Sequence, residues 1–430
     1  MSEGPIAQIA EVNPPLPRYV APDEIVSFLR MQDVSENGGI IGGSEAPFWK
    51  VANGFTRFAE GDALFAKITP CMENGKGALA LELTNGIGCG STEFHVLRAK
   101  DDNSGPFIYQ VLQSKEYRQA AQMQMSGSAG QQRVQSEFFR RHQIHIPPPP
   151  QQRRIATILT TLDEVIEATE KLVEKHQQIK AGLMHDLFTR GVTPDGNLRP
   201  TSEARKSKFG WIPKSWRVGS LLDVASPTRQ PILTGPFGAD LGTGDFVEAG
   251  VPLLRIGNVQ TGILDLENLL FVSERKATLL DRYRVREGDL LFARQGATTG
   301  RNTLATAEVE GWLINYHIIR VALDHSLCSP FFIETAFNSD VVKKQIERDK
   351  GRGTREGINS AQLRCLELPL ADFEEQQMIT QILGSNQSLL KKSQDNLAKL
   401  RHQKQGLMHD LLTGRVRVEG GNSAAVSAQS

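Results

Sequence analysis

The chain has 430 residues, and its 49 Lys and Arg are balanced by 49 Asp and Glu, which gives a formal net charge of zero. At roughly 100–200 residues per domain, this length predicts two to four domains. Zero net charge excludes a generally basic protein that coats DNA, so any contact with nucleic acid must use local patches.

The first 146 residues consist of short apolar runs separated by Gly, Asn and Asp, which is typical of a mixed α/β domain with many turns. One strand-like run covers Glu60–Lys67 and opens with Glu-Gly-Asp. The polar loop that follows it carries possible donors and acceptors, namely Lys67, Thr69, Glu73, Asn74 and Lys76. A second polar, Gly-rich loop covers residues 126–133 and ends at Arg133.

Residues 147–190 predict a long helix. Apolar or near-apolar positions recur from Ile155 to Leu183 with alternating spacings of three and four, which is the heptad seam of a coiled coil. Four prolines, Pro147–Pro150, precede the helix and mark its start, because proline cannot occupy a helix interior. A helix of about 37 residues would be about 55 Å long.

A Pro-, Gly- and charge-rich stretch, residues 191–208, predicts a solvated basic linker. A second mixed α/β segment, 209–368, opens with Trp211–Trp216 and contains a strand-like run at Glu287–Arg294. Its polar loops contain Arg294, Gln295, Thr298, Thr299, Arg301 and Asn302, and then Lys350, Arg352 and Arg355. Residues 369–418 predict a second long helix, with apolar positions from Ile379 to Leu411 and polar interruptions at Asn386 and Ser393.

The chain contains an internal repeat. Gly182–Leu187 recurs identically as Gly406–Leu411, and weaker parallels extend upstream. These parallels pair Val26–Arg30 with Val251–Arg255, Glu60–Lys67 with Glu287–Arg294, and Phe94–Arg98 with Tyr316–Arg320. We therefore predict an α/β (mixed α+β) protein with two globular units joined by two long antiparallel helices. The predicted segments are 1–146, 147–190, 191–208, 209–368, 369–418 and a disordered tail at 419–430. The alternative is a pair of core helices in unrelated domains.

The polar loops are candidate DNA contacts. Glycine allows close approach of the backbone, and Arg, Gln and Asn can pair bidentately with guanine or adenine edges. The alternative is that these loops are ordinary surface turns. The candidate DNA-binding residues are Arg30, Lys67, Asn74, Lys76, Arg133, Arg255, Arg294, Gln295, Thr298, Thr299, Arg301, Asn302, Arg352 and Arg355. We expect phosphate contacts from Arg133, Arg352 and Arg355.

Motifs of enzymes are incomplete in this sequence. Asn13–Leu16 is similar to the Asn-Pro-Pro-aromatic motif of amino methyltransferases, but Leu16 lacks the ring that stacks on a flipped base. Gly86–Gly90 and Gly296–Arg301 lack the spacing of dinucleotide- and phosphate-binding loops. Met184-His185-Asp186 offers one His per helix, which is no metal ligand set. We expect a non-catalytic chain without catalytic or metal-binding residues.

Cysteine usage and hydropathy predict the compartment. Four scattered cysteines have no C-x-x-C spacing, which argues against a zinc site or a disulfide framework and fits a reducing cytoplasm. The sequence has no apolar run near the ~18–20 residues that a membrane span requires. Its first residues lack a basic segment followed by an apolar one, so we expect no export and a cytoplasmic location.

The order of these motifs resembles the specificity subunit of type I restriction-modification systems. The resemblance rests on the duplicated Gly-Leu-Met-His-Asp-Leu ending, the Glu-Gly-Asp-Leu-Leu-Phe-Ala-Arg strand, the Pro- and Gln-containing helix openings and the Ile-Pro-Lys-Ser-Trp segment at Ile212–Trp216. The first copy lacks an Ile-Pro-x-x-Trp segment of this kind.

The resemblance implies two target recognition domains, each reading one half of a bipartite double-stranded DNA target, and helices that set the spacer. It also implies docking of two methyltransferase subunits and of restriction subunits, which would hold S-adenosylmethionine, ATP and Mg while this chain binds no cofactor. Two alternatives stay open from the residues alone: an interaction scaffold without DNA contact, and a self-contained methyltransferase.

Overall fold

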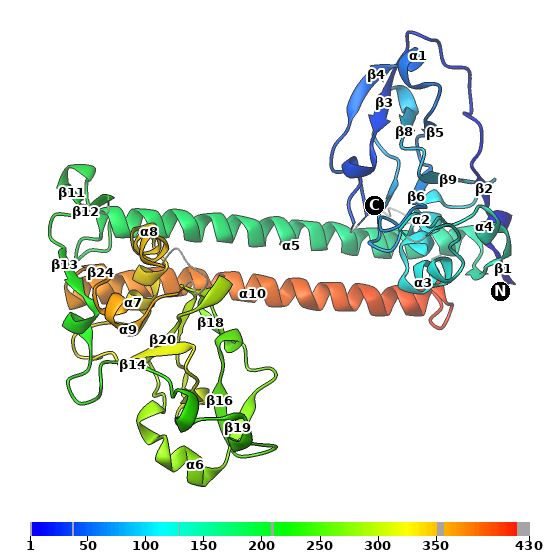
Figure 1. Cartoon of the computed structure of the whole chain (residues 1–430). Helices are drawn as coiled ribbons and strands as arrows, with labels where there is room; N and C mark the ends of the chain where they lie inside the picture. Colours follow the sequence, from blue (N-terminus) through cyan, green and yellow to red (C-terminus); the bar gives the residue numbers. More distant parts are fainter. Residues whose placement is uncertain (1, 37, 129, 208–209, 351–356, 419–430) are drawn as a thin grey trace, which may run out of the picture. The chain divides into compact units, whose positions relative to one another are not determined.

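The computed structural model describes residues 2–418, apart from residues 37, 129, 208–209 and 351–356. It divides into two compact units (Figure 1). Unit 1 consists of Met1–Leu172 and Ser393–Ser430, and unit 2 of Val173–Lys392. Each unit contains one globular part and a portion of both long helices. The predicted tail at 419–430, together with Lys208, Arg352 and Arg355, lies outside the described residues.

The globular part of unit 1 contains two four-stranded sheets. One sheet has the order β2-β9-β6-β7 and is antiparallel, and the other has the order β4-β3-β8-β5 with β3 and β8 parallel. The strands are β1 (Ser2–Pro5), β2 (Ala10–Val12), β3 (Ile25–Leu29), β4 (Ser44–Pro47), β5 (Thr56–Ala59), β6 (Ala63–Ala66), β7 (Gly77–Leu79), β8 (Ile87–Gly90), β9 (Phe94–Ala99) and β10 (Gln143–Ile146). The short helices are α1 (Phe48–Val51), α2 (Gly105–Gln113), α3 (Lys115–Met123) and α4 (Glu137–Arg141).

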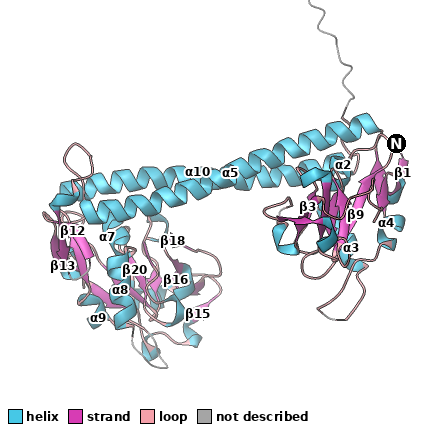
Figure 2. Ribbon diagram, turned by 90° about the horizontal axis from the view of Figure 1, so that it is seen from above, coloured by secondary structure: helices cyan, strands magenta, loops and turns pink. Residues whose placement is uncertain are grey.

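Unit 2 repeats this combination of short strands and helices (Figure 2). Its two four-stranded sheets have the orders β14-β23-β20-β21 and β15-β19-β16-β22. Its strands are β11 (Ala204–Ser207), β12 (Gly210–Pro213), β13 (Arg217–Ser220), β14 (Ile232–Thr234), β15 (Phe246–Val247), β16 (Val251–Leu254), β17 (Val259–Gln260), β18 (Ile263–Leu264), β19 (Leu270–Val272), β20 (Leu290–Ala293), β21 (Asn302–Leu304), β22 (Leu313–Ile314), β23 (Ile318–Val321) and β24 (Glu367–Leu370). Its short helices are α6 (Glu274–Leu279), α7 (Pro330–Phe337), α8 (Asp340–Asp349) and α9 (Ser360–Arg364). The predicted mixed α/β class with two globular units is confirmed.

The strand register corrects one of the predicted internal parallels. Leu64 of β6 pairs with Val96, whereas its counterpart Leu291 of β20 pairs with Arg320. Val96 is therefore equivalent to Arg320, and the alignment of Phe94–Arg98 with Tyr316–Arg320 was wrong by two residues. A shift of two residues keeps every side chain on the same face of a strand, so the apolar pattern alone could not exclude it.

The two long helices are α5 (Pro149–Arg190) and α10 (Phe373–Leu412), of 42 and 40 residues. The start of α5 lies inside the proline run rather than after it, because proline is tolerated in the first helical turn, where its missing N–H would have no partner. Within unit 1, Arg401 of α10 pairs with Glu170 of α5 at 2.6 Å, and Lys404 pairs with the earlier residue Asp163. The helices thus run antiparallel, as predicted. In the described part of the chain, no helix is both long and apolar enough to cross a membrane.

The ends of the long helices complete the cores of the globular parts. In unit 1, Leu159 of α5 and Leu411 of α10 join a buried cluster with Phe107 and other residues. In unit 2, Leu187 of α5 and Leu383 of α10 join the corresponding cluster. Leu187 and Leu411 belong to the identical six-residue repeats, so this repetition follows from a shared packing role at the helix ends.

The middle of the predicted seam is not covered along its whole length. Val165 and Leu172 are each 44% exposed in unit 1, and Ile179 is 39% exposed in unit 2. A pair of helices buries only a narrow stripe on each, so these positions lie at the edge of the contact. The predicted heptad seam is therefore only partly covered at these residues.

The stretch predicted as a solvated linker is partly folded. Val192 is buried, and its N–H donates to the Glu375 carboxylate at 2.8 Å. Arg199 pairs with the same carboxylate at 3.3 Å. Further on, β11 pairs with β12. Because the buried Glu375 needs a cation and a donor at the start of α10, residues of this stretch are drawn into unit 2.

Candidate functional site

A site in unit 1 forms where three segments meet at the end of β6. The Lys67 N–H donates to the Glu93 carbonyl at 2.9 Å, and the Val134 N–H donates to the Lys67 carbonyl at 2.9 Å. The Arg133 side chain donates from Nε and Nη2 to the two Glu93 carboxylate oxygens, at 2.9 Å each. These hydrogen bonds hold the pKa of Glu93 below its usual range, so the carboxylate stays charged beside Lys67.

Unit 2 repeats the same backbone geometry with different side chains at the end of β20. The Arg294 N–H donates to the His317 carbonyl at 3.0 Å, and the Ile358 N–H donates to the Arg294 carbonyl at 2.8 Å. Arg294 thus takes the place of Lys67, and His317 that of Glu93. We call these equivalent positions the strand-end sites of unit 1 and unit 2.

A cavity of about 500 Å³ opens at the strand-end site of unit 2. Its lining includes Phe237, Arg294, Gln295 and Tyr316. The guanidinium carbon of Arg294 lies 5.9 Å from the Phe237 ring centroid, and Nη1 donates to the Tyr316 carbonyl at 3.2 Å. Burial lowers the pKa of Arg294, and no carboxylate among the described residues pairs with it. This partly buried cation therefore faces a ring-walled cavity.

Gln295 and His317 contact each other beside that cavity. His317 Nδ1 lies 3.0 Å from Gln295 Oε1. Burial, together with the nearby Arg294, lowers the pKa of His317 and favours the neutral ring at pH 7. A neutral ring that donates from Nδ1 holds the Gln295 amide in place.

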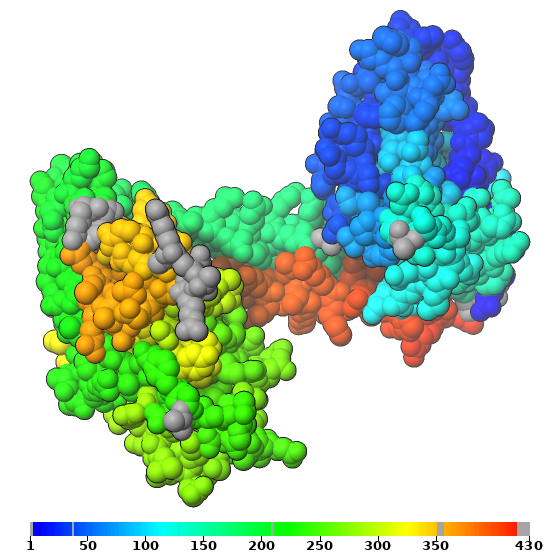
Figure 3. Space-filling view, viewed as in Figure 1, coloured from blue at the N-terminus to red at the C-terminus, as the bar shows by residue number. Residues whose placement is uncertain are grey.

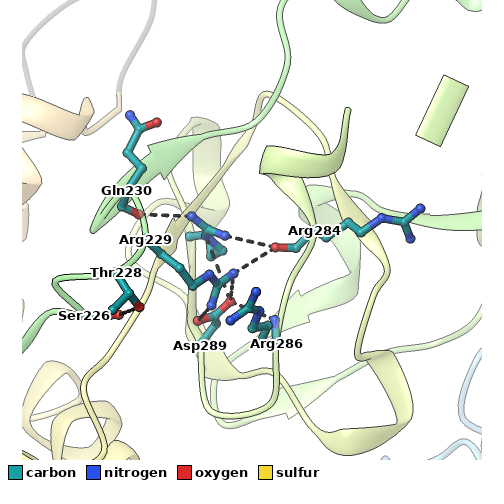
Figure 4. Close-up of polar contacts among 8 residues, drawn as sticks. Ser226, Thr228, Arg229, Gln230, Arg284, Arg286 and Asp289 are labelled. Carbon is teal, nitrogen blue, oxygen red and sulfur yellow. Dashed lines mark hydrogen bonds and ion pairs between the residues drawn. The ribbon is translucent and has the colours of Figure 1, made fainter. Parts of the chain in front are cut away.

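A buried aspartate fixes the start of the central strand in both units. Arg229 donates from both Nη atoms to Asp289, at 2.8 and 3.0 Å (Figure 4). Arg320 Nε lies 4.0 Å from the same carboxylate. Burial lowers the pKa of the almost fully enclosed Arg320 to about 10. In unit 1, Arg98 pairs with Asp62 at 2.7 Å. These ion pairs explain the repeated Gly-Asp motif, and they anchor the strands that carry Lys67 and Arg294 at their other ends.

Three predicted residues of unit 1 lie together, outside the strand-end site, and each has a partner. Arg30 pairs with Asp33 at 3.1 Å, and the Asn74 amide donates to Glu36 at 3.0 Å. Lys76 Nζ donates to a backbone carbonyl of the turn after β3, at 3.0 Å. Each of these side chains thus makes at least one polar contact within the chain in this structure.

The predicted loop of unit 2 separates into exposed and buried residues. Arg301 donates to the Gln260 amide oxygen, and Arg255 donates to a backbone carbonyl of the loop before β19. Thr298 donates to the Gln295 carbonyl at 3.2 Å and remains partly exposed.

The predicted base contacts of Thr299 and Asn302 are wrong. Thr299 is 7% exposed and Asn302 is fully buried. Asn302 lies on the inner face of β21, where its amide contacts Asn338 at 3.3 Å. A side chain enclosed in this way cannot reach a base edge. Arg352 and Arg355 lie outside the described residues.

Glu93, Phe237, Tyr316 and His317 were not among the predicted site residues. The predicted parallel of Phe94–Arg98 with Tyr316–Arg320 was two residues out of register, and this concealed that Tyr316 and His317 precede β23 and correspond to Thr92 and Glu93. Phe237 reaches the cavity from the loop after β14, far from Arg294 in the sequence. The sequence pattern contains no sign of that contact.

Comparison with known proteins supports a DNA-related role for these sites. Residues 55–180 match the family described as the type I restriction modification DNA specificity domain, and they include the strand-end site of unit 1. The chain is 37% identical over 189 residues to the EcoAI type I restriction enzyme specificity subunit of Escherichia coli, a match that covers 42% of this chain and 32% of that protein. It is 26% identical to the EcoEI specificity subunit of Escherichia coli over 85% of this chain and 74% of that protein.

Two solved structures have the same fold. The S subunit of a type I restriction-modification system from M. genitalium matches with a TM-score of 0.58 and 15% identity, and the match covers 96% of both chains. A chain from a structure of a type I R-M system matches with a TM-score of 0.55 and 16% identity, over 96% of this chain and 98% of that one. Since the matched family is a DNA specificity domain, a scaffold without DNA contact is not favoured.

Proposed function

Because the chain is an HsdS-like specificity subunit, we propose that it supplies the sequence specificity of a type I restriction-modification complex. In this proposal, each unit reads one half of an asymmetric, bipartite DNA target. Methyl transfer, ATP hydrolysis and DNA cleavage belong to partner subunits that hold S-adenosylmethionine, ATP and Mg. The complex works in the cytoplasm, where the chromosomal DNA of a bacterium or archaeon is found.

The observation that carries the proposal is the pair of strand-end sites. Lys67 and Arg294 are fixed by the same two backbone hydrogen bonds, yet different side chains surround them. Unit 1 presents the Glu93–Arg133 ion pair, and unit 2 presents a cationic cavity with aromatic walls. A shared frame with two different surfaces fits two different DNA half-sites, because sequence is read by the side chains that meet base edges.

The charge distribution fits a subunit that binds DNA together with partners. The chain has zero net charge, so its own phosphate contacts must come from local cations such as Arg133 and Lys67. Further phosphate contacts are proposed for Arg352 and Arg355. We expect the isolated chain to bind DNA weakly and with little specificity, since much of the DNA charge is neutralised by the methyltransferase subunits.

Exposed apolar residues on the long helices support docking of the partner subunits. Val165 and Leu172 in unit 1 and Ile179 and Leu389 in unit 2 are between 39% and 51% exposed. Atoms of both long helices reach the surface on the face that Figure 3 shows. We propose that two methyltransferase subunits cover these positions, that the helices set the spacer of the target, and that restriction subunits join the resulting complex.

Methylome sequencing tests this function directly. Cells with and without the chain should differ by one split, asymmetric methylation motif, which disappears on deletion of the chain. The purified chain alone should transfer no methyl group from S-adenosylmethionine to DNA. An unchanged methylome would contradict the proposal. So would a motif that is lost on deletion of the chain but is continuous rather than split.

A further inference from the structure

The cavity at the strand-end site of unit 2 has the features of a site for a nucleobase. We propose that it receives one purine base that has left the DNA stack, and that it thereby contributes to reading the half-site of unit 2. This inference rests on the proposed DNA-specificity function. It concerns a ligand site that lies entirely within unit 2.

The walls of the cavity carry exposed aromatic rings. Phe237 is 56% and Tyr316 is 40% exposed, and their ring centroids lie 5.8 Å apart with an angle of 38° between the planes. The His317 ring lies against Tyr316, with centroids 3.7 Å apart. Exposed rings at this spacing offer π-faces on which a base can stack, and such stacking needs no particular sequence.

Arg294 selects a purine within this ring-lined space. Among the described residues, the hydrogen bonds of its guanidinium go to two backbone carbonyls, at 3.2 and 3.4 Å, which are long hydrogen bonds. The described residues place no carboxylate against it, so its donors can turn to a ligand. Guanine and adenine both carry an N7 acceptor, guanine adds O6, and pyrimidines have no equivalent of N7.

Further polar groups surround the same space. Gln295, Asn359 and Gln362 line it with amides. Gln362 is engaged within the chain, because its amide accepts from the N–H of Asn359 at 2.9 Å and donates to the Asp349 carbonyl at 2.8 Å. The side-chain oxygens of Asn359 and Gln295 contact the Gln362 N–H and His317, so their amide nitrogens are the groups that can donate to the remaining edge of a base. Lys350 also lines it, and its ammonium group lies 3.7 Å from the Glu347 carboxylate. An ammonium group at this place suits the phosphate of the same nucleotide.

The concave form of the site indicates an extruded base rather than a base in the stack. Base edges of intact B-DNA lie at the floor of the grooves and are reached by side chains that project into them. Arg294 and the rings instead border a hollow of about 500 Å³, within the ~300–1,000 Å³ usual for ligand sites. A base reaches such a hollow by swinging out of the helix, as in enzymes that read flipped bases by stacking and hydrogen bonds.

Unit 1 has different groups at the equivalent positions. Thr92 and Glu93 occupy the places of Tyr316 and His317, and Arg133 closes onto Glu93 through two hydrogen bonds of 2.9 Å. These groups form an ion pair with each other, whereas unit 2 offers ring faces and an arginine that is paired with no carboxylate of the described residues. The base site is therefore assigned to one half of the target only.

Single mismatches in the target DNA test the proposal. The probes are duplexes of the bipartite target defined by methylome sequencing, each with one mispaired position, and they compete for the complex of the full-length chain with its methyltransferase subunits. A mispaired base is more easily extruded, so we expect one purine position in the unit 2 half-site where a mismatch tightens binding, on the order of tenfold. Replacing that purine by its 7-deaza analogue should remove most of the gain, since N7 is then absent.

The Tyr316→Ala variant identifies the cavity as the cause. Tyr316 is 40% exposed, so its truncation leaves the core intact. We expect that, in this variant, the mismatch at the purine position no longer tightens DNA binding. The matched control is Trp49→Ala, which removes an exposed ring of unit 1 that is 60% exposed and should leave the gain unchanged. A mismatch would also favour extrusion of a base into a methyltransferase subunit, but the resulting increase in DNA affinity would persist in Tyr316→Ala.

The outcomes separate this inference from the proposed function. If the complex reads a split target but every mismatch in the unit 2 half-site weakens binding, or if all gains persist in Tyr316→Ala, the base site is refuted and the specificity function stands. If the complex has no split target, both fail. Thermal unfolding of Tyr316→Ala that matches the unmodified chain would show that a lost gain reflects the missing ring.

Discussion

Gln152 and Gln376 occupy the same place in the two long helices and make matching hydrogen bonds. Gln152 Oε1 accepts from the N–H of Ser104 at 3.0 Å, and Gln376 Oε1 accepts from the N–H of Ser329 at 3.0 Å. Each amide also donates to the backbone carbonyl five residues earlier, at 2.9 and 3.0 Å. Ser104 and Ser329 cap the starts of α2 and α7, so each glutamine joins a globular part to its own long helix.

Replacing Gln376 by leucine should destabilise unit 2. The substitution removes the acceptor of the partly buried N–H of Ser329, which costs about 1 kcal/mol and at most about 3 kcal/mol. We expect a lower unfolding midpoint in a thermal or urea titration, and Gln152→Leu should act likewise on unit 1. The neighbouring Gln377 is exposed, so Gln377→Leu serves as the control. Equal midpoints for Gln376→Leu and Gln377→Leu would show that the buried amide contributes nothing.

Removing the Arg294 guanidinium should relax reading of one half-site only. We expect Arg294→Ala to lose about 1–3 kcal/mol of discrimination at one position of the unit 2 half-site, with unit 1 unaffected. Competition binding against targets altered in either half would measure this difference. Arg348→Ala removes an arginine of the same unit that is 68% exposed and paired with Asp349, and it should leave both half-sites unchanged. Equal losses in both halves would contradict the assignment.

The Glu93–Arg133 ion pair should make the stability of unit 1 depend on pH. Because Arg133 lowers the pKa of Glu93 in the folded chain, the pair stabilises unit 1 above the pKa of an unfolded glutamate, about 4.3, and this contribution is lost as the pH falls through the lower folded value. Unfolding of the Glu93→Gln variant, compared with the unmodified chain from pH 7 down to pH 3, should show a flatter dependence. Identical slopes would mean that Glu93 is not held by Arg133 in solution.

The sequence predicted the elements whose residues repeat for a packing reason. Leu187 and Leu411 are identical in both copies because each completes a globular core, and their spacing from other apolar residues is that of a helix. The duplicated Gly-Asp motif was visible for a similar reason, since Asp62 and Asp289 both anchor a strand.

The base-contacting side chains were harder to predict, because tertiary contacts decide which of them are exposed. Asn302 is of a residue type that often contacts bases, but it is fully buried on β21. Phe237 enters the cavity from a separate loop, and the strand pattern of Tyr316 allowed a two-residue shift without any change of face. The pattern of residue types can therefore identify the duplicated strands and helices. The surface that contacts DNA depends on which loops lie together in the folded chain.

Lengthening both long helices by one heptad should lengthen the spacer of the target. Glu170 of α5 pairs with Arg401 of α10, so seven residues inserted after Glu170 and seven inserted before Arg401 preserve the antiparallel pairing and the heptad phase. Seven helical residues add about 10.5 Å, close to three base-pair steps of about 3.4 Å. Methylome sequencing should report the same two half-sites with a spacer about three base pairs longer. A methylated motif with the original spacer would refute a spacing role for the helices, and changed half-sites would indicate that the insertion had disturbed the globular parts.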